Sequence, residues 1–354
     1  MTKGIPFLLM RGGTSRGPVF RRNDLPSDRA ALDAALLDVV GSGHALCIDG
    51  VGGSASVQCK VVMLSPSAED GVDIDYLFAQ VGTTERTVDY GPTCGNMMST
   101  VGPASIELGL LSPRDRITLR AVNTGALVEA RFALSGDRPL YAGDQEISGV
   151  PGQGSPVRLR FRDIVGAKTD ALFPTGNTQE DIIGCAATCI DLAVPVMILR
   201  ATDLGLTGGE PPERIDSDTD LMARIEAMRI EAGKRMGLGD VRGSVLPKVA
   251  LLSQPSLNGA DVRVRYLTPF SCHPSSAVTG AQAVAGCVMV PGTVFGDAQD
   301  VSDGTRLVRL EHPAGFLDVD LELRTGADGS PRIESAAILR TARKIVEGRV
   351  FLPE

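Results

Sequence analysis

The sequence contains no tryptophan, and aromatic residues make up only 4% of its 354 residues. Its net charge is −8, so it lacks the basic surface that nucleic acid or an anionic membrane would require. No apolar run approaches the roughly 18 residues of a membrane span, and residues 5–9 form too short a run for a secretion signal. We therefore expect a cytoplasmic protein with neither a nucleic-acid nor a membrane partner.

Metal ligands are also scarce. The three histidines are scattered, and the seven cysteines are odd in number and irregular in spacing. Cys185 and Cys189 form a C-x3-C pair, but no second pair or histidine partner completes a zinc site. We expect free thiols in a reducing compartment and no bound metal.

Nucleotide-binding and hydrolase motifs are missing as well. The sequence has no G-x4-G-K-[ST] loop, no G-x-G-x-x-G after a strand and no G-x-S-x-G elbow. Cofactor-free proton chemistry is the class of reaction that remains, so no cofactor is expected.

What the chain does contain is an ordered internal repeat, and its length suits two domains of about 150–180 residues. Apolar strands, a helical stretch, a turn with cysteine, a helix rich in small residues and a strand pair recur in the same order. The matched stretches are 6–10 with 194–199, 29–41 with 218–233, 53–66 with 243–255, 72–80 with 260–268, 93–110 with 271–289, and 116–134 with 306–323.

The repeat predicts an α/β (α+β) fold of two pseudo-symmetric domains, each a mostly antiparallel curled sheet around a central helix. In the stretches 93–110 and 271–289, apolar or small side chains would lie on nearly every side of a helix. This pattern is typical of a helix that is buried on every side. We expect the domains to cover residues 1–185 and 186–354, with the final strand packing back on the first domain.

Cys94 is the first candidate for chemistry, because it lies in the turn Thr93-Cys94-Gly95-Asn96 just before the helix. Backbone N–H groups at a helix start favour anions and lower the pKa of a nearby thiol. A buried cysteine that only fills space is the ordinary alternative. The turn favours an acid/base role for Cys94, with Gly95 and Asn96 offering N–H groups to substrate.

Lys60 is the second candidate. It lies in an alternating strand, where Cys59, Val61 and Met63 share one face and Lys60 and Val62 share the other. A lysine on a strand usually points into solvent, but the preceding glycines and the apolar residues that follow favour a partly buried site. A desolvated lysine can act as a base near neutral pH.

An anion site is predicted in the loop at residues 10–17, where Arg11, Thr14 and Ser15 supply donors. In the second half, Ser275 and Ser276 precede the helix and can donate to a carboxylate. Two helix starts facing a cleft between the domains would bind a dicarboxylate or tricarboxylate.

Four further residues have undecided roles. Cys272 and Lys248 occupy the repeat positions of Cys94 and Lys60, and Arg340 and Arg343 lie near the C-terminus as either substrate ligands or surface charges.

The motifs MRGGTS (10–15), IDGVGG (48–53), DYGPTCGNMMSTVGP (89–103) and FPTGNT (173–178) resemble those of the PrpF-type isomerases, and the resemblance covers essentially the whole chain. It implies the diaminopimelate epimerase fold, a tricarboxylate substrate, no cofactor and a homodimer. Whole stretches, among them YAGD (141–144) and LRTAR (339–343), look closest to enzymes acting on 4-oxalomesaconate.

The resemblance implies a catalytic pair, Lys60 and Cys94, that moves a proton along an allylic unit during bacterial breakdown of gallate and lignin-derived aromatics. The acid and base roles of the two remain open.

Three alternatives also stay open: an isomerase of 2-methylaconitate or another tricarboxylate, a two-cysteine amino-acid epimerase, and a tricarboxylate-binding protein without activity. The epimerase would need Cys272, yet the second half reads SCHPSS rather than the C-G-T-G turn of epimerases.

Overall fold

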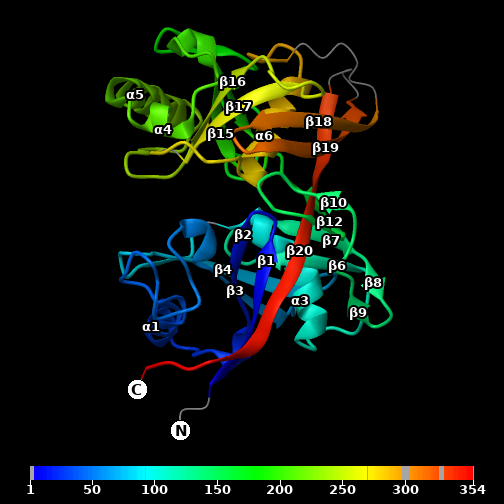
Figure 1. Cartoon of the computed structure of the whole chain (residues 1–354). Coiled ribbons are helices and arrows are strands. Elements are labelled where there is room, and N and C mark those ends of the chain that lie inside the picture. The colour runs from blue at the N-terminus through cyan, green and yellow to red at the C-terminus, as the bar shows by residue number, and fades with distance from the viewer. Residues whose placement is uncertain (1–3, 92, 269, 297–302, 327–330, 354) are drawn as a thin grey trace. The chain divides into compact units, whose positions relative to one another are not determined.

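A computed structural model describes residues 4–91, 93–268, 270–296, 303–326 and 331–353 (Figure 1). The chain divides into two compact units, Met1–Arg160 with Leu339–Glu354 and Phe161–Ile338. The second unit thus starts before residue 186, because the antiparallel strands β13 (Glu180–Ile182) and β14 (Cys185–Asp191) belong to it.

Unit 1 is a closed barrel, whose neighbouring strands follow the order β1-β2-β3-β4-β6-β7-β12-β20 and back to β1. The pairs β1–β2, β3–β4, β6–β7 and β20–β1 are antiparallel, while β2 with β3 and β4 with β6 are parallel. The strands are β1 (Ile5–Gly12), β2 (Ser15–Arg21), β3 (Lys60–Pro66), β4 (Ile74–Val81), β6 (Arg116–Ala121), β7 (Leu127–Phe132), β12 (Pro156–Arg162) and β20 (Pro331–Val350). Short strands in this part of the chain are β5 (Val88–Asp89), β8 (Leu134–Ser135), β9 (Arg138–Pro139), β10 (Gln145–Glu146) and β11 (Gln153–Gly154).

The central helical segment of unit 1 consists of α2 (Gly95–Met98) and α3 (Val101–Glu107). It contacts β1 and β2 at its start and β6 and β7 further on, and its residues from Met97 to Ser105 are buried. Small residues allow this close fit: a Cβ on Gly102 would lie 2.2 Å from the Phe132 ring. The predicted central helix is confirmed, with an interruption at Ser99 and Thr100.

The outer face of the unit 1 sheet is covered by α1 (Arg29–Val40). Its buried leucines and valines form one cluster with Cys59, Val61 and Met63. The helix begins at the cap Asp28, whose carboxylate accepts the Ala31 N–H at 2.9 Å. Two 3-10 turns, η1 (Arg22–Asp24) and η2 (Ser56–Gln58), flank this layer. The outer layer is therefore on the odd-numbered face of β3.

Unit 2 has the strand order β20-β19-β18-β17-β16-β15-β14-β13. Again most pairs are antiparallel, while β15 with β16 and β17 with β18 are parallel. Its further strands are β15 (Pro195–Arg200), β16 (Lys248–Ser253), β17 (Val262–Leu267), β18 (Gly304–His312) and β19 (Gly315–Thr325).

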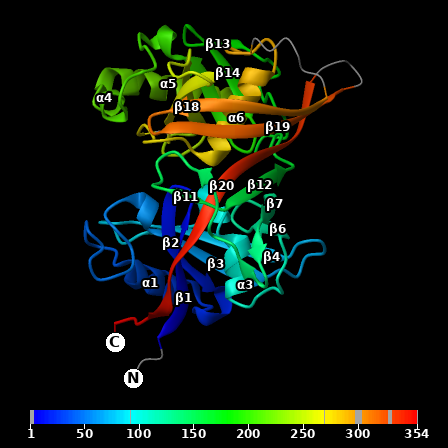
Figure 2. The ribbon, with the colours of Figure 1, turned by 45° about the vertical axis from the view of Figure 1, so that its right-hand side comes forward.

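The central helix of unit 2 is α6 (Val278–Met289), which contacts β14, β15, β16, β18 and β19. A Cβ on Gly280 would lie 2.1 Å from the Tyr266 ring, so helix and sheet are in direct contact. The other face carries α4 (Pro212–Asp216) and α5 (Thr219–Arg235), which lie beside β15 and β16 in Figure 1 and together at one side of this unit in Figure 2. The 3-10 turn η3 (Ala201–Leu204) precedes them.

The two units share one order of elements, and this confirms the fold class predicted from the repeat. The register of one match was wrong. Residues 194–199 were matched with 6–10, but β15 is the counterpart of β2, since each is followed by a 3-10 turn and runs parallel to the next strand. Short apolar strands look alike in sequence, and their direction of pairing is not visible there.

Candidate active site

The turn between β1 and β2, at Gly12 and Gly13, packs closely against the start of α2. Gly13 has φ +49°, and a Cβ there would lie 2.2 Å from Asn96 Oδ1. A Cβ on Gly12 would lie 2.5 Å from the Asn96 carbonyl oxygen. Only glycine fits at these positions, so the double glycine of MRGGTS brings the predicted anion loop to the helix that follows Cys94.

Asn96 joins three segments through its side-chain amide. Its Nδ2 donates to Thr14 Oγ1 at 3.1 Å, and its Oδ1 accepts from Arg340 Nε at 3.0 Å. Arg340 comes from β20 and is only 5% exposed. The structure thus places Arg340 beside the predicted residues Thr14 and Asn96, although 244 positions separate it from Asn96 in the sequence.

Positive charge gathers on the neighbouring strand pair. Arg11 and Arg343 lie directly opposite each other on β1 and β20, where two like charges are unfavourable without an anion. Arg11 Nη1 donates to the carbonyls of Gly13 and Thr341, both at 3.0 Å. Burial and then Arg343 lower the pKa of Arg11. These cations favour an anionic ligand.

Arg11, Thr14 and Ser15 line one cavity of about 220 Å³. Its other walls come from the η2 region and the loop 149–151; the remaining lining residues are Gly13, Arg16, Val57, Gln58, Gly149, Val150, Pro151 and Ile345. Lys60 and Cys94 are absent from this lining. The structure therefore brings the three predicted anion ligands together at a cavity and connects them to Asn96 through Thr14.

Cys94 is the cap residue of α2 and is 9% exposed. Its carbonyl accepts the Met98 N–H at 3.0 Å and the Tyr76 hydroxyl at 3.1 Å. Burial, followed by the proximity of Cys94, raises the pKa of Tyr76, which keeps its hydroxyl protonated as a donor. The thiol makes no capping hydrogen bond. Tyr76 thus fixes the Cys94 backbone.

Lys60 is the first residue of β3, and its Nζ donates to Gln80 Oε1 at 2.7 Å. The same Nζ lies 5.4 Å from the Phe78 ring centroid. Gln80 is itself held, because its Nε2 donates to the Cys59 carbonyl at 3.0 Å. The lysine is therefore held in one orientation by its neighbours on β4.

Lys60 and Cys94 each contact a side chain on the same face of β4. Lys60 is opposite Gln80 in the register, and Tyr76 and Phe78 follow on the same face of β4. The Tyr76 and Phe78 ring centroids are 6.4 Å apart. Since Lys60 meets Phe78 and Tyr76 binds Cys94, both candidates lie on the inner face of the barrel, opposite α1.

Cys272, which occupies the repeat position of Cys94, has different surroundings. α6 begins at Val278, six positions after Cys272, so this thiol does not cap the helix. Cys272 lies in the apolar cluster under α5, and its N–H donates to Asp216 Oδ1 at 2.7 Å. Burial and then the Asp216 charge raise the pKa of Cys272 to about 12. Its surroundings therefore disfavour the thiolate form of Cys272.

The serines before α6 are both buried. The Ser275 N–H donates to His273 Nδ1 at 2.9 Å. Ser276 is 4% exposed, and its Oγ has no hydrogen-bond partner among the described residues. A buried hydroxyl without a partner is unfavourable, so an acceptor that reached the Ser276 Oγ would be bound.

Lys248 begins β16 as Lys60 begins β3. Burial and then the Arg229 guanidinium lower the pKa of Lys248 to about 8. No hydrogen bond or ion pair of its Nζ is found in the described ranges, in contrast to Lys60, which is held by Gln80.

Sequence reasoning missed Tyr76, Gln80 and the contact of Arg340 with Asn96. Tyr76 and Gln80 share an alternating face of residues 74–80 with Phe78, which was the available signal; nothing local indicates the Arg340 contact. Within the described residues, no group of three or more His, Cys, Asp or Glu side chains is placed to hold a metal ion. Over the same ranges, no helix is long and apolar enough to cross a membrane.

Comparisons with known proteins cover the whole chain. The family model described as PrpF protein matches residues 2–353. The chain is 44% identical to an Escherichia coli (strain K12) protein named as an isomerase, YbhH, covering 99% of this chain and 100% of the relative. It is 42% identical to the 4-oxalomesaconate tautomerase of Pseudomonas putida, covering 98% and 96%. A crystal structure of methylitaconate-delta-isomerase matches with a TM-score of 0.83 and 30% identity, covering 99% of this chain and 96% of that one.

Proposed function

Because the chain belongs to the PrpF family and is an isomerase like its curated relatives, we propose that its substrate is 4-oxalomesaconate. The reaction is a 1,3-allylic proton transfer that uses side chains and no cofactor. The observation that carries the proposal is that Lys60 and Cys94 meet the same inner face of β4, in a chain that matches a 4-oxalomesaconate tautomerase over 98% of its length. The pathway we propose is bacterial breakdown of aromatic compounds.

The substrate's carboxylates are bound first by the cationic strand pair. Arg11, facing Arg343, and the hydroxyls of Thr14 and Ser15 supply the donors around the cavity. Ser275 and Ser276 hold a remote carboxylate, as the unmet Ser276 hydroxyl favours. These contacts fix the allylic unit before any bond changes.

The proton then moves in two steps. Lys60, as the free amine, removes a proton from the acidic carbon and becomes an ammonium group, leaving a dienolate. The backbone N–H groups of Gly95 and Asn96 stabilise the enolate oxygen. The Cys94 thiol gives its proton to the other end of the allylic unit and becomes a thiolate. A proton returned from Lys60 to Cys94 resets both groups.

The first test is proton NMR of the protein with 4-oxalomesaconate in D2O, where isomerisation should introduce deuterium at one carbon. Lys60→Met should lower turnover by several orders of magnitude, as expected for loss of the base. Lys234→Met, which removes an exposed lysine of α5, is the matched control and should keep turnover. Near-normal turnover in Lys60→Met would end the proposal.

The roles of the pair are separated by Cys94→Ser. If Lys60 is the base, this variant still exchanges the proton of the acidic carbon for deuterium but forms little isomer. If the roles are reversed, exchange is lost in Cys94→Ser and persists in Lys60→Met.

A parallel sample distinguishes the substrate. The TM-score of 0.83 to a methylitaconate-delta-isomerase favours a methyl-bearing dicarboxylate or tricarboxylate as the second candidate. If methylitaconate or 2-methylaconitate reacts and 4-oxalomesaconate does not, the residues keep their roles and the substrate assignment is wrong.

A further inference from the structure

Unit 2 contains a second cavity, of about 310 Å³, where β15 and β16 end. Both polar and apolar residues line it. The lining residues are Arg200, Thr202, Thr207, Leu252, Ser253, Gln254, Val294 and Phe295. This size lies at the lower end of the range for small-molecule sites.

Three of the polar residues have unused hydrogen-bonding capacity. Neither Arg200 nor Gln254 has a side-chain hydrogen bond or ion pair within the described ranges. Ser253 is 7% exposed, and its Oγ is likewise without a partner among these residues. A buried hydroxyl without a partner is unfavourable. Because the Ser253 Oγ lies against Gly208 and is itself buried, Arg200 and Gln254 are the donors that a ligand in the cavity can reach.

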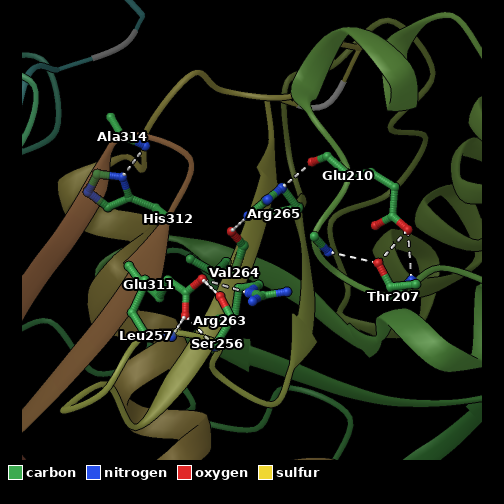
Figure 3. Close-up of polar contacts among 11 residues, drawn as sticks. Thr207, Glu210, Ser256, Leu257, Arg263, Val264, Arg265, Glu311, His312 and Ala314 are labelled. Atoms are coloured by element: carbon green, nitrogen blue, oxygen red, sulfur yellow. Dashed lines mark hydrogen bonds and ion pairs between the residues drawn. The ribbon is translucent and has the colours of Figure 1, made fainter.

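The arginines on the adjoining strands have partners, as Figure 3 shows, while Glu210 Oε2 has none among the described residues. Arg263 Nε lies 2.7 Å from Glu311 Oε1, and Arg265 Nε donates to the Glu210 carbonyl at 2.6 Å. The Glu210 carboxylate accepts both the N–H and the hydroxyl of Thr207, each at 2.8 Å. Arg200 is therefore the lining cation that remains available for an anion.

The repeat shows why Arg200 is available. Arg21 ends β2 as Arg200 ends β15, and Arg21 Nη2 donates to the Leu108 carbonyl where α3 ends. In unit 2 the Thr293 hydroxyl donates instead to the Cys287 carbonyl, near the end of α6. At this repeat position, Arg21 therefore binds a carbonyl at the end of the central helix in unit 1, whereas Arg200 lines a cavity in unit 2.

The cavity is separate from the substrate residues proposed in the same unit. Ser276 precedes α6 and Val294 follows it, and a 12-residue helix is about 18 Å long. Lys248 and Ser253 likewise stand at opposite ends of β16. A ligand held by Arg200 would not touch Ser275 or Ser276.

We propose that this cavity is a second binding site, for a small carboxylate with an apolar or aromatic body. The Arg200 guanidinium holds the carboxylate in a bidentate pair, and the Gln254 amide donates to the same group. Leu252, Val294 and Phe295 contact the carbon body. The proposal does not depend on which substrate the Lys60–Cys94 pair transforms.

Benzoate is the probe, measured by isothermal titration calorimetry against the full chain, with benzyl alcohol as the uncharged analogue. Benzoate should bind saturably and benzyl alcohol should not. Arg200→Gln should weaken benzoate binding by about tenfold or more, the usual effect of losing a charge-assisted pair. Turnover in Arg200→Gln should stay at the wild-type level.

Gln254→Glu supplies a second variant that places a negative charge at the cavity from an exposed position. It should also weaken benzoate binding at least tenfold, whereas Asn258→Asp, an exposed control with the same change of charge, should not. Should circular dichroism show Arg200→Gln to be misfolded, this pair of variants decides alone. Absence of saturable binding, or equal binding in wild type and Gln254→Glu, would overturn the proposal.

Discussion

Lys248 offers a test of how burial acts on charge in unit 2. Its amine is partly buried, and burial and Arg229 lower its pKa from 10.5 to about 8. A difference of this size between the unfolded and folded chain corresponds to roughly 3 kcal/mol of destabilisation when the amine is charged. Lys248→Met should therefore raise the free energy of unfolding near pH 7 by about 2–3 kcal/mol.

The direction of the pH dependence follows from the lowered pKa. Below about pH 8 the lysine is charged in both states, so the full destabilisation is present. Between about 8 and 10.5 the unfolded chain binds more protons than the folded one, and stability rises with pH. At about pH 9.5 roughly 2 of the 3 kcal/mol should have disappeared.

Urea unfolding of wild type and Lys248→Met, near pH 7 and again near pH 9.5, measures the effect. A two-unit chain can unfold in two steps, so the transition that shifts in the variant is the one to compare. The control is Lys234→Met, which removes an exposed lysine from the same unit. If the free energy of unfolding of Lys248→Met equals that of wild type near pH 7 and near pH 9.5, burial of the charged Lys248 amine does not destabilise unit 2.

Three further outcomes follow. Gly280→Ala should lower the stability of unit 2 by about 1–3 kcal/mol in urea unfolding, because its Cβ would lie 2.1 Å from the Tyr266 ring. Cys272→Ala should keep turnover within about threefold of wild type while costing about 1–2 kcal/mol of stability; loss of turnover with an intact fold would instead favour a two-thiol epimerase. Asn96→Ala removes the hydrogen bonds to the anion loop and to Arg340, so kcat/KM should fall about tenfold or more, and an unchanged value would contradict the role of Asn96.

Most elements of the fold were predictable because their signals are local. The helical stretches predicted at 29–41 and 218–233 are α1 and α5, and each begins at an aspartate cap. The alternating pattern around Lys60 placed Val61 and Met63 on the outer face, where they pack under α1. Patterns of period two and 3.6 carry this information within a few residues.

Contacts over long sequence distances were not predictable. Arg340 meets Asn96 only because β20 returns to close the barrel beside β1. The cavity at Arg11 also needs the loop 149–151, which has no pattern of its own. Cys272 was placed beside the start of the second helix, but five residues separate it from α6, since the chain first makes a loop through His273-Pro274.

The two repeats have diverged at equivalent positions, and the divergence bears on which thiol takes part in the proposed reaction. Cys94 directly precedes a helix, whereas Cys272 lies in an apolar cluster beside Asp216 with a pKa of about 12. A thiol that stays protonated can donate a proton but does not remove one from carbon. A two-thiol mechanism would need both cysteines at the substrate, and the position of Cys272 in the apolar cluster under α5 argues against that. In our proposal the partner of Cys94 is therefore Lys60, which Gln80 holds on the same inner face of the barrel.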